Sequence, residues 1–158
     1  MLPTPPEEHF AQAALRHYDD AVYLHDDGRL PNADHHYGFS VECALKSLLL
    51  RHLNATMAPL KPGGKPSPCP WTPDASGKPK QHKHLPGLWS DVATLVHGRS
   101  GSTLAAMLNS SAPFANWDVA DRYHGNPPLS LTTVDERKSA AAQILTMHQQ
   151  TLITGLLQ

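Results

Sequence analysis

Proline is concentrated in one stretch of this 158-residue chain, and this concentration limits where long helices can form. Seven of the 15 prolines lie in residues 58–84, together with three of the 10 glycines. Proline removes a backbone donor and clashes with the preceding helical turn, so this stretch cannot form the interior of a helix. We therefore expect residues 58–84 to form one long, flexible loop inserted between helical segments.

The same stretch differs in charge from the rest of the chain. It contains five lysines and one acidic residue, Asp74, which gives it a net charge of +4. The whole chain carries −1, so the remaining residues together carry −5. This balance argues against a uniformly basic nucleic-acid-binding protein and leaves a local basic surface open.

Apolar residues recur at helical spacing on both sides of the loop. The stripes predict helices over residues 4–27, 33–53, 85–97, 102–108 and 133–155. Residues 98–101 would separate two short helices, and residues 110–128 would be irregular. Thr4 with Glu7, and Thr133 with Glu136, have the spacing of capping boxes. Sustained period-two alternation is missing, so the predicted fold is a single all-α domain over 1–158, an antiparallel bundle of four to five helices.

Cysteine usage and hydropathy indicate the compartment. Cys43 and Cys69 are the only cysteines, which excludes a disulfide-rich secreted scaffold. The sequence contains neither a run of 18 apolar residues nor a secretory signal pattern at its start. We therefore expect a cytoplasmic protein that does not engage a membrane.

Histidine and glycine patterns bear on metals and cofactors. His35 and His36 are adjacent, and His82 and His84 lie two apart, but these spacings match no common zinc pattern. Phosphate-loop and dinucleotide-binding glycine motifs are also missing. We predict neither a metal site nor a cofactor.

Two segments carry candidate ligand-binding residues. In residues 116–124, Trp117, Arg122, Tyr123 and His124 combine rings with a cation, as phosphate or base recognition requires. The alternative is a loop that the two rings anchor, with Arg122 bonded to backbone carbonyls or to Glu42.

The second candidate segment is the helical stripe of residues 33–51. Glu42 and Lys46 lie four residues apart there, as in a helical ion pair. They would form a solvated salt bridge or lie at the edge of the core, where a charge needs a partner. Arg122 is one candidate for that partner.

These segments resemble a known family. The stretch FAQAALRHYDDAVYLHDDGRLPNADHHYGFSVECALKSLL is similar to the first two helices of HEPN (higher eukaryotes and prokaryotes nucleotide-binding) domains, with Gly38, Glu42 and Lys46 among the matching residues. Trp117-Asp118-Val119 and Arg122-Tyr123 look like the segment that precedes the family's last helix. The resemblance covers residues 8–53 and 114–124 and implies an antiparallel bundle, often a homodimer.

The resemblance also implies a choice of functions. Many HEPN proteins are RNases of prokaryotic toxin–antitoxin or defence systems, and others bind nucleotides or RNA without catalysis, in some cases beside a nucleotidyltransferase. The catalytic members carry Arg-x4–6-His near the last helix, with Arg and His supplied by two protomers. Here Arg122 and His124 are separated by one residue, and Arg137 and His148 by ten. Arg29 stands six residues before His35, but this pair lies at the turn between the first two helices and not near the last one. The catalytic pair is therefore not carried over.

Three functions follow, in order of preference. The first is a non-catalytic module that binds a nucleotide or RNA through Trp117, Tyr123, Arg122, Glu42 and Lys46. The second is a homodimeric assembly protein that pairs through the apolar end of its last helix. The third is a metal-independent RNase that uses Arg122 with His124 or His35.

Overall fold

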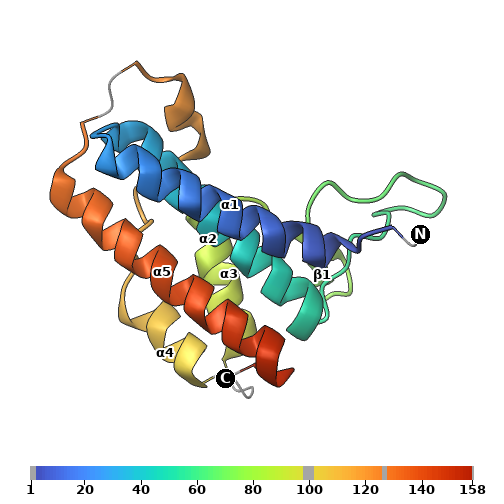
Figure 1. Ribbon diagram of the computed structural model, residues 1–158. Coiled ribbons are helices and arrows are strands. Elements are labelled where there is room, and N and C mark those ends of the chain that lie inside the picture. Colours follow the sequence, from blue (N-terminus) through green and yellow to red (C-terminus); the bar gives the residue numbers. More distant parts are fainter. Residues whose placement is uncertain (1–2, 98–101, 126–127, 158) are drawn as a thin grey trace.

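The computed structural model describes residues 3–97, 102–125 and 128–157. The predicted separator at 98–101 lies outside these residues. The described residues form five α-helices, one 3-10 helix and one two-stranded hairpin, so the prediction of a mostly helical fold is confirmed (Figure 1). The elements are α1 Pro6–Asp26, α2 Leu30–His52, β1 Trp71–Pro73, β2 Pro79–Gln81, α3 Gly87–Val96, α4 Ser102–Ser110, η1 Val119–Tyr123 and α5 Leu131–Thr154.

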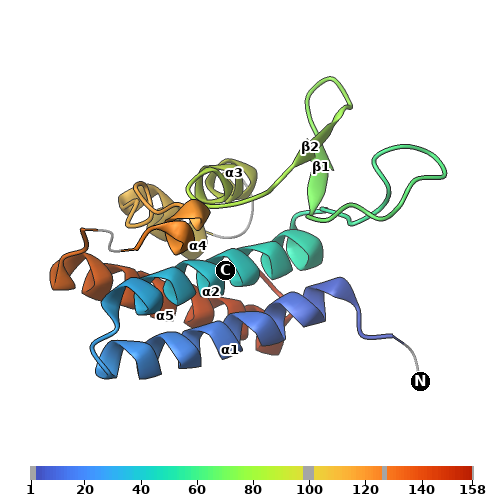
Figure 2. The ribbon, with the colours of Figure 1, turned by 90° about the horizontal axis from the view of Figure 1, so that it is seen from above.

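Helix α2 is the central element of the fold. It packs against α1 and α5 on one side, while α3 and η1 contact it from the other (Figure 2). α1 and α2 run antiparallel and are joined by a tight turn, in which Gly28 has a φ of +76° that favours glycine. Because α2 is covered on several sides, its charged residues Asp34, Glu42 and Lys46 are buried and need partners.

Four helices begin at residues that differ from the predicted ones, whereas α4 begins at the predicted Ser102. The predicted cap at Thr4 is wrong, since α1 begins after Pro5, which makes no side-chain cap. α2 begins three residues earlier than predicted, because a proline fits its first turn, where no backbone donor is needed. α5 begins two residues before Thr133, with the Ser130 hydroxyl accepting from the Thr133 amide at 3.1 Å.

The segment predicted as one loop contains the β1–β2 hairpin, which is the departure from an all-α fold. Trp71 pairs with Gln81, and the backbone of Thr56 bridges to Trp71. Each strand has three residues, too few to show an alternating pattern in the sequence. His82 follows β2 and ties the hairpin to α3, with Nδ1 2.9 Å from the Asp91 carboxylate.

The core lies between α2 and its neighbours. Its largest fully buried side chains include Trp117, Tyr37, Phe114, Leu45, Leu48, Leu49, Leu88 and Ile144. Among the described residues, none of the helices combines the length and apolar character needed to cross a membrane.

Candidate functional site

The predicted ligand-binding segment forms η1 and the turn before it, and Trp117 anchors it to α2. The Trp117 ring is 1% exposed and stacks on His35 with centroids 5.1 Å apart. Its Nε1 donates to the Asp34 carbonyl oxygen at 3.3 Å, and Gly38 leaves the space that the ring occupies. In this conformation the ring offers no open face to a ligand, so Trp117 positions the segment.

Arg122, Tyr123 and His124 lie together on the exposed end of η1. The Arg122 guanidinium lies over the Tyr123 ring, 4.7 Å from its centroid, and donates to its hydroxyl at 2.9 Å. The Tyr123 ring is 75% exposed. His124 Nδ1 lies 3.4 Å from the Asp121 carboxylate. The structure therefore brings three predicted residues to one solvent-facing group.

An open pocket of about 540 Å³ lies beside this group. It is lined by Asn116, Asp121, His124, Pro128, Leu129, Thr133 and Arg137. The Arg122 charge also acts on His35: burial, followed by this cation, lowers the pKa of His35. Charged and ring-bearing side chains thus surround a space large enough for a small polar ligand.

Arg137 forms part of the pocket wall and of a buried ion pair. Its Nη1 donates to the Asp34 carboxylate at 2.6 Å, and its Nε donates to the Pro113 carbonyl oxygen at 3.0 Å. Burial raises the pKa of Asp34, and the hydrogen bond and charge of Arg137 oppose that shift. This cation is therefore committed to the fold, in contrast to Arg122.

Sequence reasoning missed this pair, although a signal was present. Arg137 follows Val134 by three residues and precedes Ala141 by four, so it occupies a position in the apolar stripe of α5. A cation at such a position predicts a buried carboxylate partner. The partner, Asp34, lies 103 residues away, so nothing local identifies it.

Glu42 and Lys46 belong to a separate cluster. Glu42 accepts a hydrogen bond from the Leu85 amide at 2.9 Å, and His84 Nδ1 lies 3.2 Å from both of its carboxylate oxygens. Lys46 Nζ lies 3.6 Å from Glu42. These contacts fasten the start of α3 to α2. No ion pair links them to η1 in the part of the chain that the structure describes, and Arg122 does not pair with Glu42.

His148 is also buried in the fold. It is 2% exposed, and its Nε2 lies 2.9 Å from the Ser47 hydroxyl. That hydroxyl donates its proton to the Glu7 carbonyl oxygen, so His148 Nε2 is the donor in their bond. Burial, followed by the Arg51 charge, lowers the pKa of His148 to about 4.

This lowered pKa predicts acid sensitivity. The folded pKa of His148 lies below its ordinary value of 6.5, so its contribution to stability is present above pH 6.5 and falls as pH drops toward 4. Between pH 7 and pH 5 we expect a loss of about 2 kcal/mol in the free energy of unfolding from this residue. Urea unfolding of wild type and His148→Gln at both pH values checks this, because the loss should be smaller by that amount in the variant.

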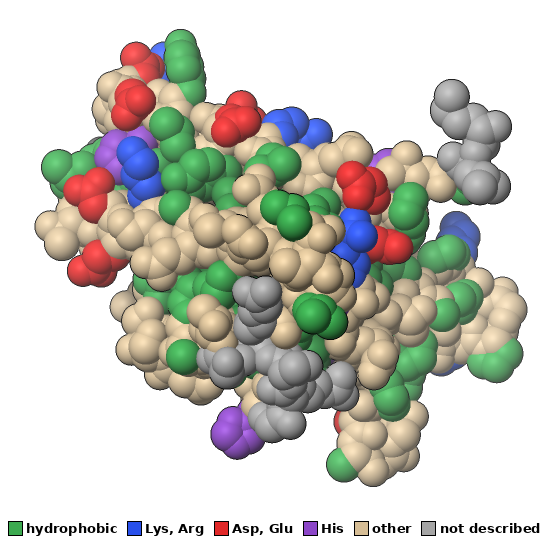
Figure 3. Space-filling model, turned by 60° about the horizontal axis from the view of Figure 1, so that its bottom comes forward, with side chains coloured by type: hydrophobic (Ala, Val, Ile, Leu, Met, Phe, Trp, Pro, Cys, Tyr) green, Lys and Arg blue, Asp and Glu red, His purple; other side chains and the backbone are tan. Residues whose placement is uncertain are grey.

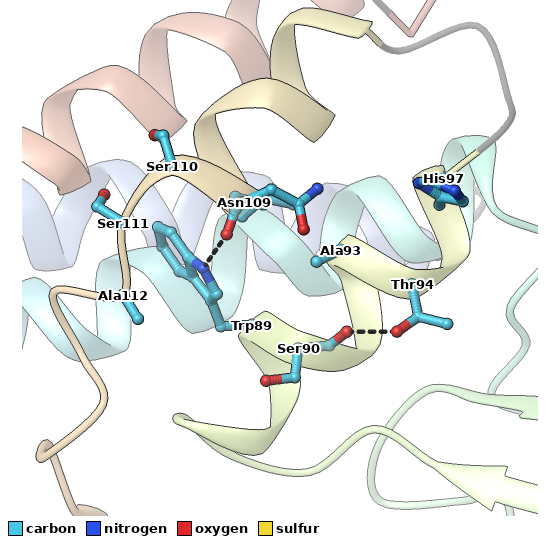
Figure 4. A pocket seen from close by; sticks show the side chains of 10 residues that line it. Trp89, Ser90, Ala93, Thr94, His97, Asn109, Ser110, Ser111 and Ala112 are labelled. Carbon is cyan, nitrogen blue, oxygen red and sulfur yellow. Dashed lines mark hydrogen bonds between the residues drawn. The ribbon is translucent and has the colours of Figure 1, made fainter.

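A second open pocket, of about 650 Å³, lies between α3 and α4 (Figure 4). Two of its polar groups are bonded to the protein: Trp89 Nε1 donates to the Leu108 carbonyl oxygen and the Thr94 hydroxyl to the Ser90 carbonyl oxygen, each at 2.9 Å. His97 is the only titratable residue among its lining residues. This pocket lacks the convergent charges found beside η1.

No protein-family model matches the chain, and neither a curated protein nor a solved structure matches it. The class of this protein is therefore described from its own structure. It is a mostly helical protein in which α1, α2 and α5 pack together and η1 presents an arginine, a tyrosine and a histidine beside an open pocket.

Proposed function

We propose that this chain is a non-catalytic, HEPN-like module that binds the phosphate groups of a nucleotide or of RNA at η1, as part of a prokaryotic toxin–antitoxin or defence system. The observation that carries the proposal is the exposed Arg122 guanidinium lying on the exposed Tyr123 ring. A guanidinium offers paired donors that match phosphate oxygens, and an exposed ring offers a surface on which a base can stack.

The charge of Arg122 is available for such a ligand. Within the described ranges, no carboxylate lies within 4.0 Å of its guanidinium, whereas Arg51 and Arg137 each contact one at 2.7 Å or less. The neighbouring pocket adds Asn116 and His124, which can contact a ribose or a second phosphate.

Two features support the HEPN-like and non-catalytic parts of the proposal. The antiparallel α1 and α2 cover the residues 8–53 that carry the sequence resemblance. Arg137 and His148, the arginine and histidine of the last helix, are both buried, and each is hydrogen-bonded to a residue of α2. Of the residues considered for an RNase, Arg122 remains, either with His124, from which one residue separates it, or with His35, whose ring is stacked on Trp117.

Replacing Arg122 with alanine is the direct test. We expect a labelled single-stranded RNA oligonucleotide, or labelled ATP, to bind the Arg122→Ala variant at least about 10-fold more weakly, because a hydrogen bond to a charged group contributes about 1.5–3 kcal/mol. Fluorescence anisotropy at fixed salt measures the affinity, and the RNA should be recovered intact. Arg16→Ala removes an exposed cation from α1 and should bind like wild type.

The outcomes separate the candidate functions. Equal binding by wild type and Arg122→Ala, or no binding by either, would contradict the proposal. RNA cleavage that depends on Arg122 and His124 would favour the RNase.

The second candidate is homodimeric assembly, which the exposed end of α5 favours. Leu152, Ile153 and Leu156 are 44%, 79% and 67% exposed there. Hydrophobic side chains are also exposed elsewhere: on the face shown in Figure 3 they lie in several separate groups. Light scattering that gives a dimer mass, in a protein that binds neither probe, would place assembly first. A nucleotidyltransferase-type partner stays a prediction of the resemblance.

A further inference from the structure

Two histidines and one aspartate meet where α1 and α2 cross, away from the η1 group. His17 and Asp20 lie one turn apart on α1, and His36 lies on α2. One ligand atom from each residue lies within 4.8 Å of those from the other two. We propose that His17, Asp20 and His36 bind a divalent transition-metal cation.

The separation of the two imidazoles fits joint coordination. Their Nδ1 atoms lie 3.2 Å apart. Two nitrogens that each bind a metal at about 2.0–2.1 Å are about 3.3 Å apart in a tetrahedral site and about 2.9 Å apart when adjacent in an octahedral site. The observed distance falls between these values, so the two nitrogens already have the separation that a shared metal requires.

The two rings are held in place by the packing of α1 on α2. The Phe39 ring lies 5.4 Å from the His17 ring and 6.2 Å from the His36 ring, measured between centroids. The Ser40 hydroxyl donates to the Ala14 carbonyl oxygen at 2.8 Å and fixes the two helices to each other. His36 thus faces α1, whereas its sequence neighbour His35 stacks on Trp117. His35 and His36 are adjacent in the sequence, but on α2 their side chains contact different neighbours.

The protonation state of His17 also suits a metal. Burial, followed by the charges of His36 and Arg16, lowers the pKa of His17, and Asp20 opposes this shift. The neutral imidazole, which is the ligating form, therefore prevails at neutral pH. In the metal-free contact one ring donates a hydrogen bond from its Nδ1 to the Nδ1 of the other. When a metal binds both Nδ1 atoms, the proton of the donor ring moves to Nε2 of that same ring, which stays neutral.

The donor set indicates which cations fit. Two imidazole nitrogens and one carboxylate oxygen suit Zn²⁺, Co²⁺ or Ni²⁺ better than Mg²⁺ or Ca²⁺, which prefer oxygen ligands. Asp20 is exposed and can rotate toward the metal, and three protein ligands leave at least one position for water. Arg16 is the neighbouring cation that opposes metal binding, which favours a site of moderate affinity.

Titration of the tag-free full chain with Zn²⁺, after treatment with a chelator, tests the site. We expect calorimetry to show one bound equivalent of moderate affinity, and bound Co²⁺ to show an absorption spectrum with nitrogen ligands. His17→Gln and His36→Gln should each weaken binding at least about 10-fold, the lower end of what the loss of an outer-shell partner causes. Asp20→Asn should weaken it by a smaller factor.

Matched controls lie on the same helix. His9→Gln and Asp19→Asn change exposed residues of the same types on α1 and should bind Zn²⁺ like wild type. Circular dichroism verifies the fold of each variant. If the histidine variants fail to fold, Asp20→Asn and the Co²⁺ spectrum of wild type decide, because Asp20 is exposed. Wild-type affinity in His36→Gln, or no bound equivalent in wild type, would overturn the proposal and leave the imidazoles as a hydrogen-bonded pair.

Discussion

Replacing Arg137 with methionine is expected to lower the free energy of unfolding by about 3–5 kcal/mol, the usual cost of removing one partner from a buried ion pair. Methionine keeps much of the apolar stem, so the loss reports on the charge. Without Arg137, the Asp34 carboxylate stays buried with its cation gone, and the Pro113 carbonyl oxygen loses its donor. Urea unfolding at pH 7 measures the effect.

The pH dependence of this loss identifies its cause. Burial already raises the pKa of Asp34, and removing the opposing cation raises it further. A raised folded pKa costs stability above that pKa, and the cost disappears as the pH falls and Asp34 becomes protonated. The difference between wild type and Arg137→Met should therefore be smaller at pH 5 than at pH 7.

A surface pair provides the control. Arg29 contacts Asp27 at 2.7 Å, with side chains that are 65% and 46% exposed. Arg29→Met should change stability by no more than about 1 kcal/mol, because solvent screens such a pair. A loss below 1 kcal/mol in Arg137→Met, or one equal to that in Arg29→Met, would show that the buried pair contributes little.

The helical part of the fold was predictable because apolar stripes depend on the local sequence alone. Buried residues such as Val41, Leu45 and Leu48 repeat at the spacing of one helix face, so α2 could be placed before its neighbours were known. Helix starts were less predictable, because they depend on single atoms. The hydroxyl of Ser130, rather than that of Thr133, accepts the first hydrogen bond of α5.

The candidate site also has one part that the local sequence predicts and one part that depends on helix packing. Arg122, Tyr123 and His124 are consecutive, so their common exposure follows from one short segment. The contacts between helices do not follow from any one segment. His84 meets Glu42 across 42 residues and His36 meets His17 across 19, and only the packing of the helices brings them together. The sequence pattern marked Glu42 as a charge that needs a partner without identifying it.

Replacing Gly38 with alanine is expected to destabilise the protein by about 3 kcal/mol, although alanine in a helix interior is favoured over glycine by about 1 kcal/mol. A Cβ at this position would overlap Cε2, Cζ2 and Nε1 of Trp117. The ring cannot move aside without disturbing its neighbours, because it is enclosed by the core and stacked on His35. Overpacking of this kind costs about 1–3 kcal/mol and occasionally more. Thermal or urea unfolding measures the loss.

Gly87→Ala is the matched control. Gly87 is the first residue of α3, and apart from its chain neighbours and the nearby backbone of its own helix no atom lies within 4 Å of the Cβ that alanine would add there. This variant should be as stable as wild type or up to about 1 kcal/mol more stable. If the overlap with Trp117 is the cause, Gly38→Ala should cost little in a Trp117→Leu background, where the ring is gone. A Gly38→Ala variant as stable as Gly87→Ala would contradict the close approach of α2 to Trp117.

The same substitution connects the core to the proposed ligand site. Trp117 lies five residues before Arg122, and its ring fastens the start of η1 to α2. A ring displaced by an alanine Cβ shifts this anchor, and with it the guanidinium and the Tyr123 ring. Folded Gly38→Ala protein should therefore bind the RNA or ATP probe more weakly than Gly87→Ala, although Gly38 itself has no side chain to offer a ligand. Unchanged affinity in a destabilised Gly38→Ala variant would mean that η1 keeps its position without Trp117.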